Sequence, residues 1–297
     1  MANSNTAPHF MVIGYLYTQS LEEVDRIQFG KLTHVNYSFV LPTTAGNLTE
    51  VDDAVMKRLV SQAHKQGVKV GLAVGGWNDG NTSGFEAMAA SPAFRATFVA
   101  NLMVLVEQYD LDGIDMDWEY PNALSAGDFL TLMRELSTRL RPRGKLLTLA
   151  VIAEDDEHGQ FIPKEIFPLI DALNIMSYDW KYQTGVHHSP YAVAETSLDY
   201  WLARGCPKDK AVLGVPFYGR SPSEALTYRQ LLAKDAEAPG KDAVDGVLYN
   251  GLATMRRKTE LARSKGGGIM FWELTQDTSD ATSLLGAIDE TVRGFRS

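Results

Sequence analysis

Short apolar runs alternate with helical patterns eight times along the chain, and this alternation constrains the fold more than any other feature. Strands are predicted at residues 10–17, 33–40, 68–74, 109–121, 146–151, 172–178, 211–216 and 268–272. Nearly continuous apolar runs of this kind are typical of parallel strands that are covered on both faces. Eight such units fill most of the 297 residues. The sequence therefore predicts an α/β fold, a single-domain (β/α)8 TIM barrel, which typically needs about 250 residues.

Helices are predicted between these strands. Their expected ranges are 20–32, 51–65, 91–109, 128–140, 163–170, 193–203, 253–264 and 283–295, with a further short helix at 228–234. Ser20 and Glu23 have capping-box spacing, and Pro92 stands at a favoured first helical position. The alternative is a doubly wound open sheet, but that fold needs a glycine-rich turn after its first strand. The glycines at 266–268 precede a strand, and we interpret them as a flexible lead-in.

Three acidic side chains share one face of the fourth predicted strand. Asp115, Asp117 and Glu119 are spaced by two residues, so they point to the same side, while the apolar residues between them point to the other. Most acidic runs are solvated surface. The apolar spacing and Pro121 at the strand end instead favour an active site, which in a barrel lies where the strands end. Crowded carboxyl groups raise one another's pKa, and this keeps one of them protonated near neutral pH.

Aromatic and polar side chains gather at the other predicted strand ends. They are Tyr15, Tyr17, Tyr37, Phe39, Trp77, Tyr120, Met176, Tyr178, Asp179, Trp180, Phe217, Tyr218, Arg220, Trp272 and Glu273. A single aromatic residue here is more often barrel packing than a ligand contact. Several of them around crowded acids favour a sugar site, since sugar rings stack on aromatic faces and their hydroxyls bind polar groups. Hydrolysis of a glycosidic bond also needs a carboxylic acid.

A metal site is the rival use of the carboxylates. No histidine lies beside the acids in the sequence, so only hard cations bound by oxygen ligands remain as an alternative, and we expect no metal. His187 and His188 are adjacent in the chain, where side chains diverge in direction. We interpret this pair as loop structure or the edge of a groove.

Composition narrows the range of partners. The net charge of −9 argues against nucleic acid and anionic membranes. Cys206 is the single cysteine, which excludes an internal disulfide and a thiolate cluster, and its predicted place in a turn argues against a catalytic thiol. No apolar run reaches about 18 residues, and the first nine residues lack a signal-peptide pattern. We expect a monomer, either a mature secreted form or a cytoplasmic protein.

The segment from Asp112 to Glu119 resembles the DGxDxDxE signature of glycoside hydrolase family 18, the chitinases and their relatives. The resemblance extends, in order, to residues 75–77, 176–179, 214–220 and 271–273. It implies a catalytic barrel over residues 1–297 that retains the anomeric configuration, with the 2-acetamido group of the substrate as the nucleophile. Because the substrate supplies the nucleophile, the resemblance also implies that no cofactor is needed.

The same resemblance implies roles for individual residues. Glu119 is expected to be the general acid and then the base, Asp117 to orient the acetamido N–H, and Asp115 to share a proton with Asp117. Tyr178 is expected to hydrogen-bond the acetamido group, and Trp272 to form the floor under the sugar. The remaining expected substrate contacts are Tyr15, Trp77, Met176, Asp179, Tyr218 and Arg220.

Two features depart from the family pattern. Ala73 stands where the family often has a serine, and we expect its loss to alter a network between Asp112 and Asp115 and to change the pH optimum. Deep-groove chitinases carry an extra α+β domain between the positions of Arg220 and Gly266, but here the segment is too short for more than barrel helices. We therefore expect an open, shallow groove and endo-type cleavage of chitin or N-acetylglucosamine oligosaccharides.

Two other functions stay open. Endo-β-N-acetylglucosaminidases that cleave N-glycan cores tend to carry glutamine where this chain has Met176, so the sequence favours chitin. Chitin-binding lectins built on the same barrel usually lack the acid found here at Glu119.

Overall fold

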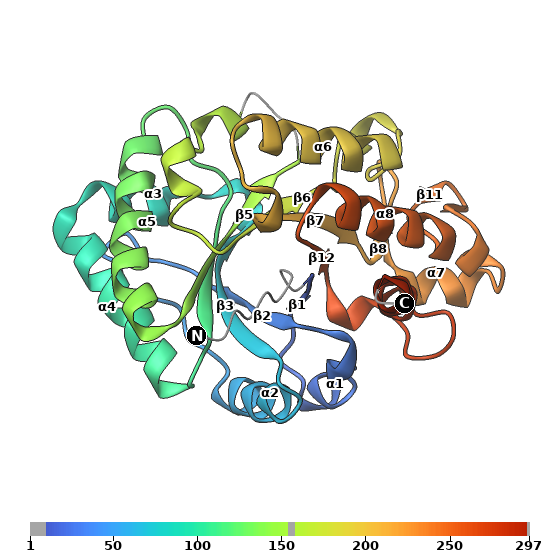
Figure 1. The fold of residues 1–297 in the computed structure, drawn as a ribbon, viewed down its shortest axis with the longest axis horizontal. Helices are drawn as coiled ribbons and strands as arrows, with labels where there is room; N and C mark the ends of the chain where they lie inside the picture. The colour runs from blue at the N-terminus through green and yellow to red at the C-terminus, as the bar shows by residue number, and fades with distance from the viewer. Residues whose placement is uncertain (1–9, 154–157, 296–297) are drawn as a thin grey trace, which may run out of the picture.

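A closed ring of eight parallel strands forms the centre of the molecule, with helices around it (Figure 1). The computed structural model describes residues 10–153 and 158–295. The strands follow the ring order β1, β12, β7, β6, β5, β4, β3, β2. Their bounds are β1 Met11–Leu16, β2 His34–Val40, β3 Lys69–Gly76, β4 Gly113–Trp118, β5 Leu146–Ile152, β6 Ala172–Met176, β7 Ala211–Pro216 and β12 Gly268–Trp272. The predicted (β/α)8 barrel is confirmed.

Side chains alternate between the barrel interior and the outer helices. One buried cluster fills the interior and consists of Ile13, Tyr15, Ala73, Ala150, Ala172, Met176, Val212 and Met270. A much larger cluster packs the outer strand faces against the helices, and it contains Ile114, Met116 and Trp118. The predicted division of β4 is therefore confirmed: its apolar residues face the helices, and Asp115 and Asp117 face the interior.

Six longer helices cover the ring. They are α2 Asp53–Lys65, α4 Pro92–Gln108, α5 Ala126–Leu140, α6 Tyr191–Ala203, α8 Leu252–Lys265 and α9 Leu284–Gly294. The start of α4 has the predicted chemistry, because the Ser91 side chain accepts from the Phe94 N–H and Pro92 opens the helix. Helix α3, Ser83–Ala90, was not predicted; it packs against α4 and α5.

Two predicted helices are wrong in extent. Helix α1 covers only Leu21–Asp25, and the Ser20 side chain makes no capping bond. The Ser20 N–H donates to Thr18 Oγ1, and the Glu23 carboxylate accepts from Arg26, so the predicted capping box does not form. The helix predicted at 163–170 is reduced to one 3-10 turn, Lys164–Ile166. Pro168 lacks the N–H group that an α-helix would need at that position.

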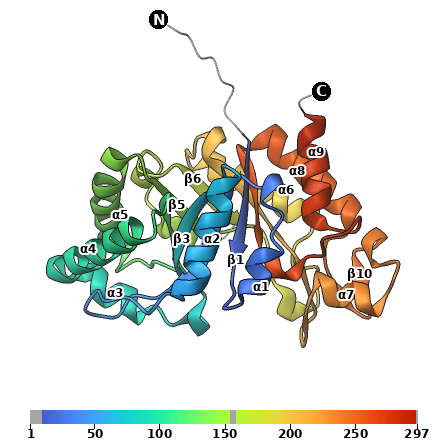
Figure 2. The ribbon, with the colours of Figure 1, turned by 90° about the horizontal axis from the view of Figure 1, so that it is seen from below.

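The segment between β7 and α8 contains more than the helices predicted for it. Four short antiparallel strands form a small sheet: β8 Tyr218–Arg220, β9 Ala225–Thr227, β10 Ala243–Val244 and β11 Val247–Leu248. Helix α7, Tyr228–Lys234, packs beside it. In Figure 2 this unit lies toward the end of the barrel where the strands finish. Two- and three-residue strands build a local elaboration of the barrel rather than an inserted domain.

The glycines at 266–268 are a site of close backbone approach, so their interpretation as a flexible lead-in is wrong. A Cβ on Gly267 would lie 2.1 Å from the carbonyl oxygen of Asp209, and one on Gly268 would lie 2.7 Å from the Cβ of Met11. Only glycine lets the chain enter β12 so close to its neighbours.

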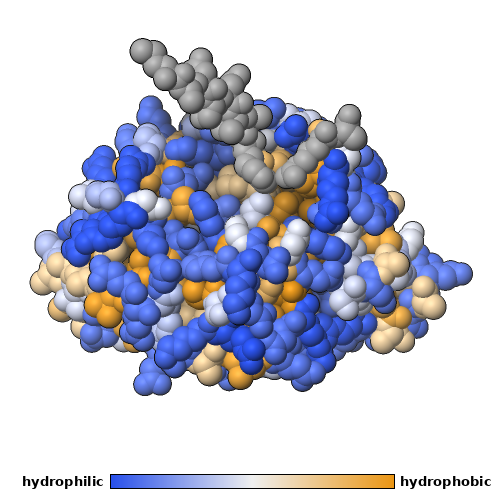
Figure 3. Space-filling view, turned by 60° about the horizontal axis from the view of Figure 1, so that its bottom comes forward, coloured by the Kyte–Doolittle hydropathy of each residue, from blue (hydrophilic) through white to orange (hydrophobic). Residues whose placement is uncertain are grey.

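The surface seen in Figure 3 is mainly hydrophilic, with hydrophobic side chains in scattered patches. In the described part of the chain, no single helix is long and apolar enough to cross a membrane alone. One pair, Gly84–Ala90 with Pro92–Gln108, passes that test of length and composition only when taken together, and it is bent by 113°.

Candidate active site at the carboxyl ends of the strands

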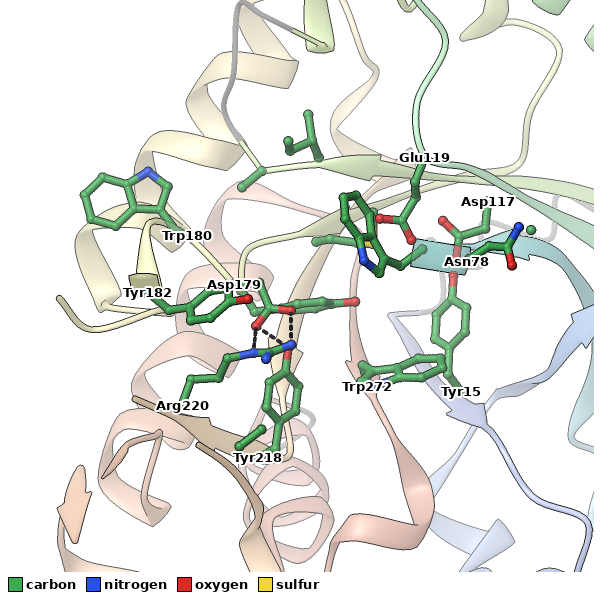
Figure 4. Close-up of a pocket in the computed structure, with 18 of the residues that line it drawn as sticks. Tyr15, Asn78, Asp117, Glu119, Asp179, Trp180, Tyr182, Tyr218, Arg220 and Trp272 are labelled. Carbon is green, nitrogen blue, oxygen red and sulfur yellow. Dashed lines mark hydrogen bonds and ion pairs between the residues drawn. The ribbon is translucent and has the colours of Figure 1, made fainter. Parts of the chain in front are cut away.

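A groove of about 1370 Å³ opens where the barrel strands end. Ten of the predicted site residues line it: Tyr15, Trp77, Asp117, Glu119, Met176, Tyr178, Asp179, Tyr218, Arg220 and Trp272. The eleventh, Asp115, is fully buried one step further down β4. Figure 4 shows Asp117 and Glu119 side by side, with the Tyr15 ring reaching up to Asp117 and Trp272 below them in the view. The barrel thus brings together residues from both ends of the chain.

Asp115 receives hydrogen bonds from three sides. Tyr15 donates to its Oδ2 at 2.6 Å, and Thr148 and Asn174 donate to its Oδ1 at 2.5 and 3.0 Å. Burial raises the pKa of Asp115 to about 6, and the three hydrogen bonds oppose that rise. Thr148 and Asn174 were not predicted, although each is a polar residue inside an apolar strand run, which was a usable signal.

The expected network between Asp112 and Asp115 is wrong. Asp112 precedes β4 at the opposite end of the strand, where it accepts from the Val70 N–H at 2.7 Å and contacts His64 Nε2 at 2.8 Å. Ala73 pairs in register with Asp115 and has no hydroxyl group, whereas Thr148 on the other neighbouring strand donates its hydroxyl to Asp115. The donor expected at position 73 is therefore supplied from β5.

The pKa values of Asp117 and Glu119 both lie above the ordinary values of these side chains. Burial first, and then the charges of Glu119 and Asp115, raise the pKa of Asp117 well above its ordinary value. Within the described structure, the buried Oδ1 of Asp117 has no hydrogen-bond partner. Burial also raises the pKa of Glu119 to about 7; a hydrogen bond from Tyr120 opposes this, and the charge of Asp179 adds to it. A carboxyl group with that pKa can both donate and accept a proton near pH 7.

Aromatic rings form the floor and rim of the groove. Trp272 stacks on Phe39 with ring centroids 5.3 Å apart, and it also contacts Tyr15 and Tyr17 at about 6 Å. Trp77 is 61% exposed at the rim. The residue before it, Gly76, has a left-handed φ of 88°, and a Cβ there would lie 2.8 Å from the Phe39 ring. Glycine at position 76 therefore allows the Phe39 ring to pack against the backbone beneath the groove.

Asp179 is the carboxylate of a clamp on the other side of the groove (Figure 4). It accepts from Arg220 Nε at 2.7 Å, Arg220 Nη2 at 3.0 Å and the Tyr218 hydroxyl at 2.8 Å. Burial alone would raise the pKa of Asp179, but its contacts with His188 and Arg220 hold the pKa below the ordinary value. The side chain is therefore a fixed negative charge facing Glu119.

The profile of glycosyl hydrolases family 18 matches residues 11–277. The chain belongs to this family. The family 18 match covers the whole ring of strands, from β1 to β12.

Several chitinases resemble this family 18 chain. "Probable chitinase 10" of Drosophila melanogaster is 31% identical over 249 residues, which cover 73% of this chain and 11% of that protein. "Endochitinase" of Manduca sexta is 33% identical over 233 residues, covering 67% and 42%. This chain thus spans less than half the length of these two curated relatives.

Two solved structures have the same fold over nearly the full chain. The GH18 chitinase ChiB from the chitin utilization locus of Flavobacterium johnsoniae has a TM-score of 0.89 at 28% identity, with 97% of this chain and 96% of that chain covered. The Group IV chitinase of Ostrinia furnacalis, in complex with allosamidin, has a TM-score of 0.82 at 25% identity, covering 96% and 100%.

Further residues of this family 18 groove lie in loops and were not predicted. His158 stacks on Tyr120 at 5.0 Å, and Tyr182 stacks under the Arg220 guanidinium at 4.4 Å. Of the predicted histidine pair, His188 is fully buried behind Tyr218, so it is structural. In the part of the chain that the structure describes, no group of three or more metal-binding side chains is arranged to hold an ion.

Cys206 lies outside the groove. Its side chain is buried in the turn between α6 and β7, and burial raises the pKa of its thiol to about 12. A thiol with that pKa is a weak nucleophile at neutral pH.

Proposed function

We propose that this chain is a chitinase that hydrolyses β-1,4 linkages between N-acetylglucosamine units with retention of configuration. Family membership and the chitinase names of its relatives support this proposal. The observation that carries it is the pairing of Glu119, which has a pKa of about 7, with a buried Asp117 across from the Trp272 floor. An aromatic floor suits the apolar face of a sugar ring.

The state of the carboxyl groups favours a nucleophile that comes from the substrate. Among the described residues that line the groove, three carry carboxyl groups: Asp117, Glu119 and Asp179. Asp179 is occupied by Arg220 and Tyr218, and the raised pKa of Asp117 favours its neutral form, which is a poor nucleophile. If Glu119 is the acid, the acetamido oxygen of the substrate is the best remaining group to attack the anomeric carbon.

The proposed reaction has two steps. Glu119 gives its proton to the glycosidic oxygen, the bond from that oxygen to the anomeric carbon breaks, and the acetamido oxygen bonds to that carbon as an oxazolinium ion. Asp117, which shares one proton with Asp115, orients the acetamido N–H and stabilises its positive charge. Glu119 then removes a proton from water, the water oxygen bonds to the anomeric carbon, and the ring of the intermediate opens.

The surroundings of the groove support an endo-acting enzyme formed by one catalytic unit. The segment after β7 adds only a small sheet and α7, and these leave the groove without the wall of an inserted domain. We propose that residues 1–297 act as a single catalytic domain on chitin chains or N-acetylglucosamine oligosaccharides.

The experiment that tests the mechanism is hydrolysis of chitohexaose, with the anomers of the products read by NMR within the first minutes. We expect the β-anomer at the new reducing ends, because two inversions at the same carbon retain configuration. An early α-anomer would rule out the substrate-assisted route.

The matched variant for this test is Glu119→Gln, which keeps the shape of the side chain and removes its proton. We expect kcat to fall by about 10³-fold or more, since Glu119 serves both steps, while binding of chitohexaose in calorimetry is retained. Wild-type binding without cleavage would instead favour a lectin, and cleavage of glycoprotein cores an endo-β-N-acetylglucosaminidase.

A further inference from the structure

A buried polar cluster lies behind the loop that carries Tyr178 and Asp179. We name it the Lys258 cluster, and it consists of Ser177, Ser189, Asn250 and Lys258. Its members come from the loop after β6, from the end of the small-sheet segment and from helix α8. None of these four residues was predicted from the sequence to have a role at the site.

Lys258 is the centre of this cluster and is fully buried. Its Nζ donates to the carbonyl oxygen of Ser189 at 2.7 Å, to Ser189 Oγ at 2.7 Å and to Asn250 Oδ1 at 2.6 Å. An ammonium group has three donors, and here each has one oxygen acceptor. Within the described structure, no carboxylate forms an ion pair with Lys258. Burial lowers the pKa of Lys258 to about 7, and the charge of Asp242 opposes this shift.

The cluster joins the two ends of the loop. Ser189 Oγ donates to the carbonyl oxygen of Ser177 at 2.6 Å, and Asn250 Nδ2 donates to the carbonyl oxygen of Ser189 at 2.9 Å. Ser177 is two residues before Asp179, and Ser189 directly follows His188. Lys258 therefore fixes the loop where it leaves β6 and where it returns toward α6.

His188 carries this constraint to the clamp. The backbone N–H of Asp179 donates to His188 Nδ1 at 3.3 Å, and the N–H of Trp180 donates to the His188 carbonyl oxygen at 2.9 Å. The His188 ring also packs against Tyr218 at 5.1 Å. His188, anchored through Ser189, is thus in contact with both the carboxylate of the clamp and one of its donors.

A buried ammonium group without a carboxylate partner is costly, and an apolar residue in α8 would fill the same volume without that cost. We propose that Lys258 is a positioning residue for the Asp179 clamp: it holds the loop from behind so that Asp179 faces Glu119. This proposal rests on the proposed chitinase function. Its consequence is electrostatic, because the fixed charge of Asp179 adds to burial in raising the pKa of Glu119.

The test compares Lys258→Met with Lys265→Met, a control on the same helix whose partners, Asp199 and Glu195, lie on the surface. The measurement is the pH profile of kcat/KM on chitohexaose from pH 4 to 9. Loosening the clamp should lower the pKa of Glu119, so the alkaline limb in Lys258→Met should move to lower pH by about 0.3–0.5 unit. KM should rise about threefold to tenfold, and the control should keep the wild-type profile.

A second background separates positioning from a general loss of folded protein. In Asp179→Asn the charge is already gone, so adding Lys258→Met should move the alkaline limb no further. The proposal is overturned if Lys258→Met keeps the wild-type limb, or if it shifts the limb equally in the Asp179→Asn background. Should Lys258→Met fail to fold, Ser189→Ala decides by the same criteria, since it removes only one acceptor of Lys258 and the bond to Ser177. A wild-type enzyme that does not cleave chitohexaose would refute the proposed function itself.

Discussion

The three carboxyl groups on β4 and directly after it differ in pKa because their surroundings differ. Asp115 receives three hydrogen bonds, Asp117 has a buried oxygen without a described partner, and Glu119 faces the groove and the charge of Asp179. Donors favour the charged form of a carboxyl group, and burial without donors favours the neutral form. The pKa of each of these acids is therefore set by the side chains around it and not by residue type alone.

Because of Asp117, the free energy of unfolding of the protein should fall as the pH rises. Its pKa is raised on folding, so below the ordinary value near 3.8 both states hold the proton, and above it the unfolded chain gains by ionising. Asp117→Asn should thus melt at least about 2 °C higher than wild type at pH 7, which in a chain of this size corresponds to about 1 kcal/mol. This advantage should shrink to nothing below about pH 4. The chitinase activity of Asp117→Asn should fall sharply, because Asp117 is proposed to orient the acetamido group.

Thermal unfolding followed by circular dichroism from pH 3.5 to 8 checks this expectation. Exposed Asp209→Asn is the control and should follow the wild-type curve. An Asp117→Asn variant that is less stable than wild type at pH 7 would show that the carboxylate form is favoured by folding.

Neighbouring strands cooperate at one level of the barrel. In the register of β3, β4 and β5, Ala73, Asp115 and Thr148 are direct partners. Of these two flanking partners, Thr148 on β5 donates its hydroxyl to Asp115, and Ala73 on β3 has no donor in its side chain. Asp115 therefore receives a hydroxyl donor from one of its two flanking strands.

Moving the hydroxyl group between these strands should move the acid limb of the kcat/KM profile in opposite directions. Thr148→Val removes a donor, so the pKa of Asp115 should rise above about 6 and the limb should shift up by about 0.5–1 unit. Ala73→Ser adds a donor and should shift the limb down. Thr138→Val, on the exposed face of α5, is the control. Shifts of the same sign in both variants would contradict this account of Asp115.

Elements with a strong period were predictable, and elements set by distant contacts were not. The strands and the acid face of β4 follow from apolar period two and from continuous apolar runs. The small sheet consists of strands too short to show a period, and α1 ends at Asp25 without the predicted capping bond. The site was found through Glu119 and its neighbours, and Asn174 could have been found as a polar residue inside an apolar strand run. Lys258 contacts Ser189 across more than 50 residues of sequence, where local pattern carries no signal.

The molecule as a whole is a family 18 barrel with a modest elaboration on one side of its groove. That elaboration, α7 and the four short strands, is continuous with β7 and carries Tyr218 and Arg220 into the groove. A long chain can lie across a groove whose ends are open, and cleavage then falls at several linkages.

The expected result is a mixture of products from chitohexaose at early times. Dimer, trimer and tetramer should appear together, because the proposed open groove would accept the substrate in several positions. Product ratios by chromatography at less than about a tenth of full conversion measure this, with Glu119→Gln as the blank. Release of the disaccharide alone would contradict an endo-acting groove and favour a closed, exo-acting one.

The buried thiol in the turn before β7 can report how often this part of the barrel opens. Because Cys206 is the single cysteine and is shielded by packing, a thiol reagent can modify it only when this part of the barrel opens. The rate of labelling of the wild-type protein, followed by mass spectrometry, then measures how often the turn between α6 and β7 opens. Slower labelling in the presence of a bound oligosaccharide would show that binding in the groove raises the free energy of opening around Cys206.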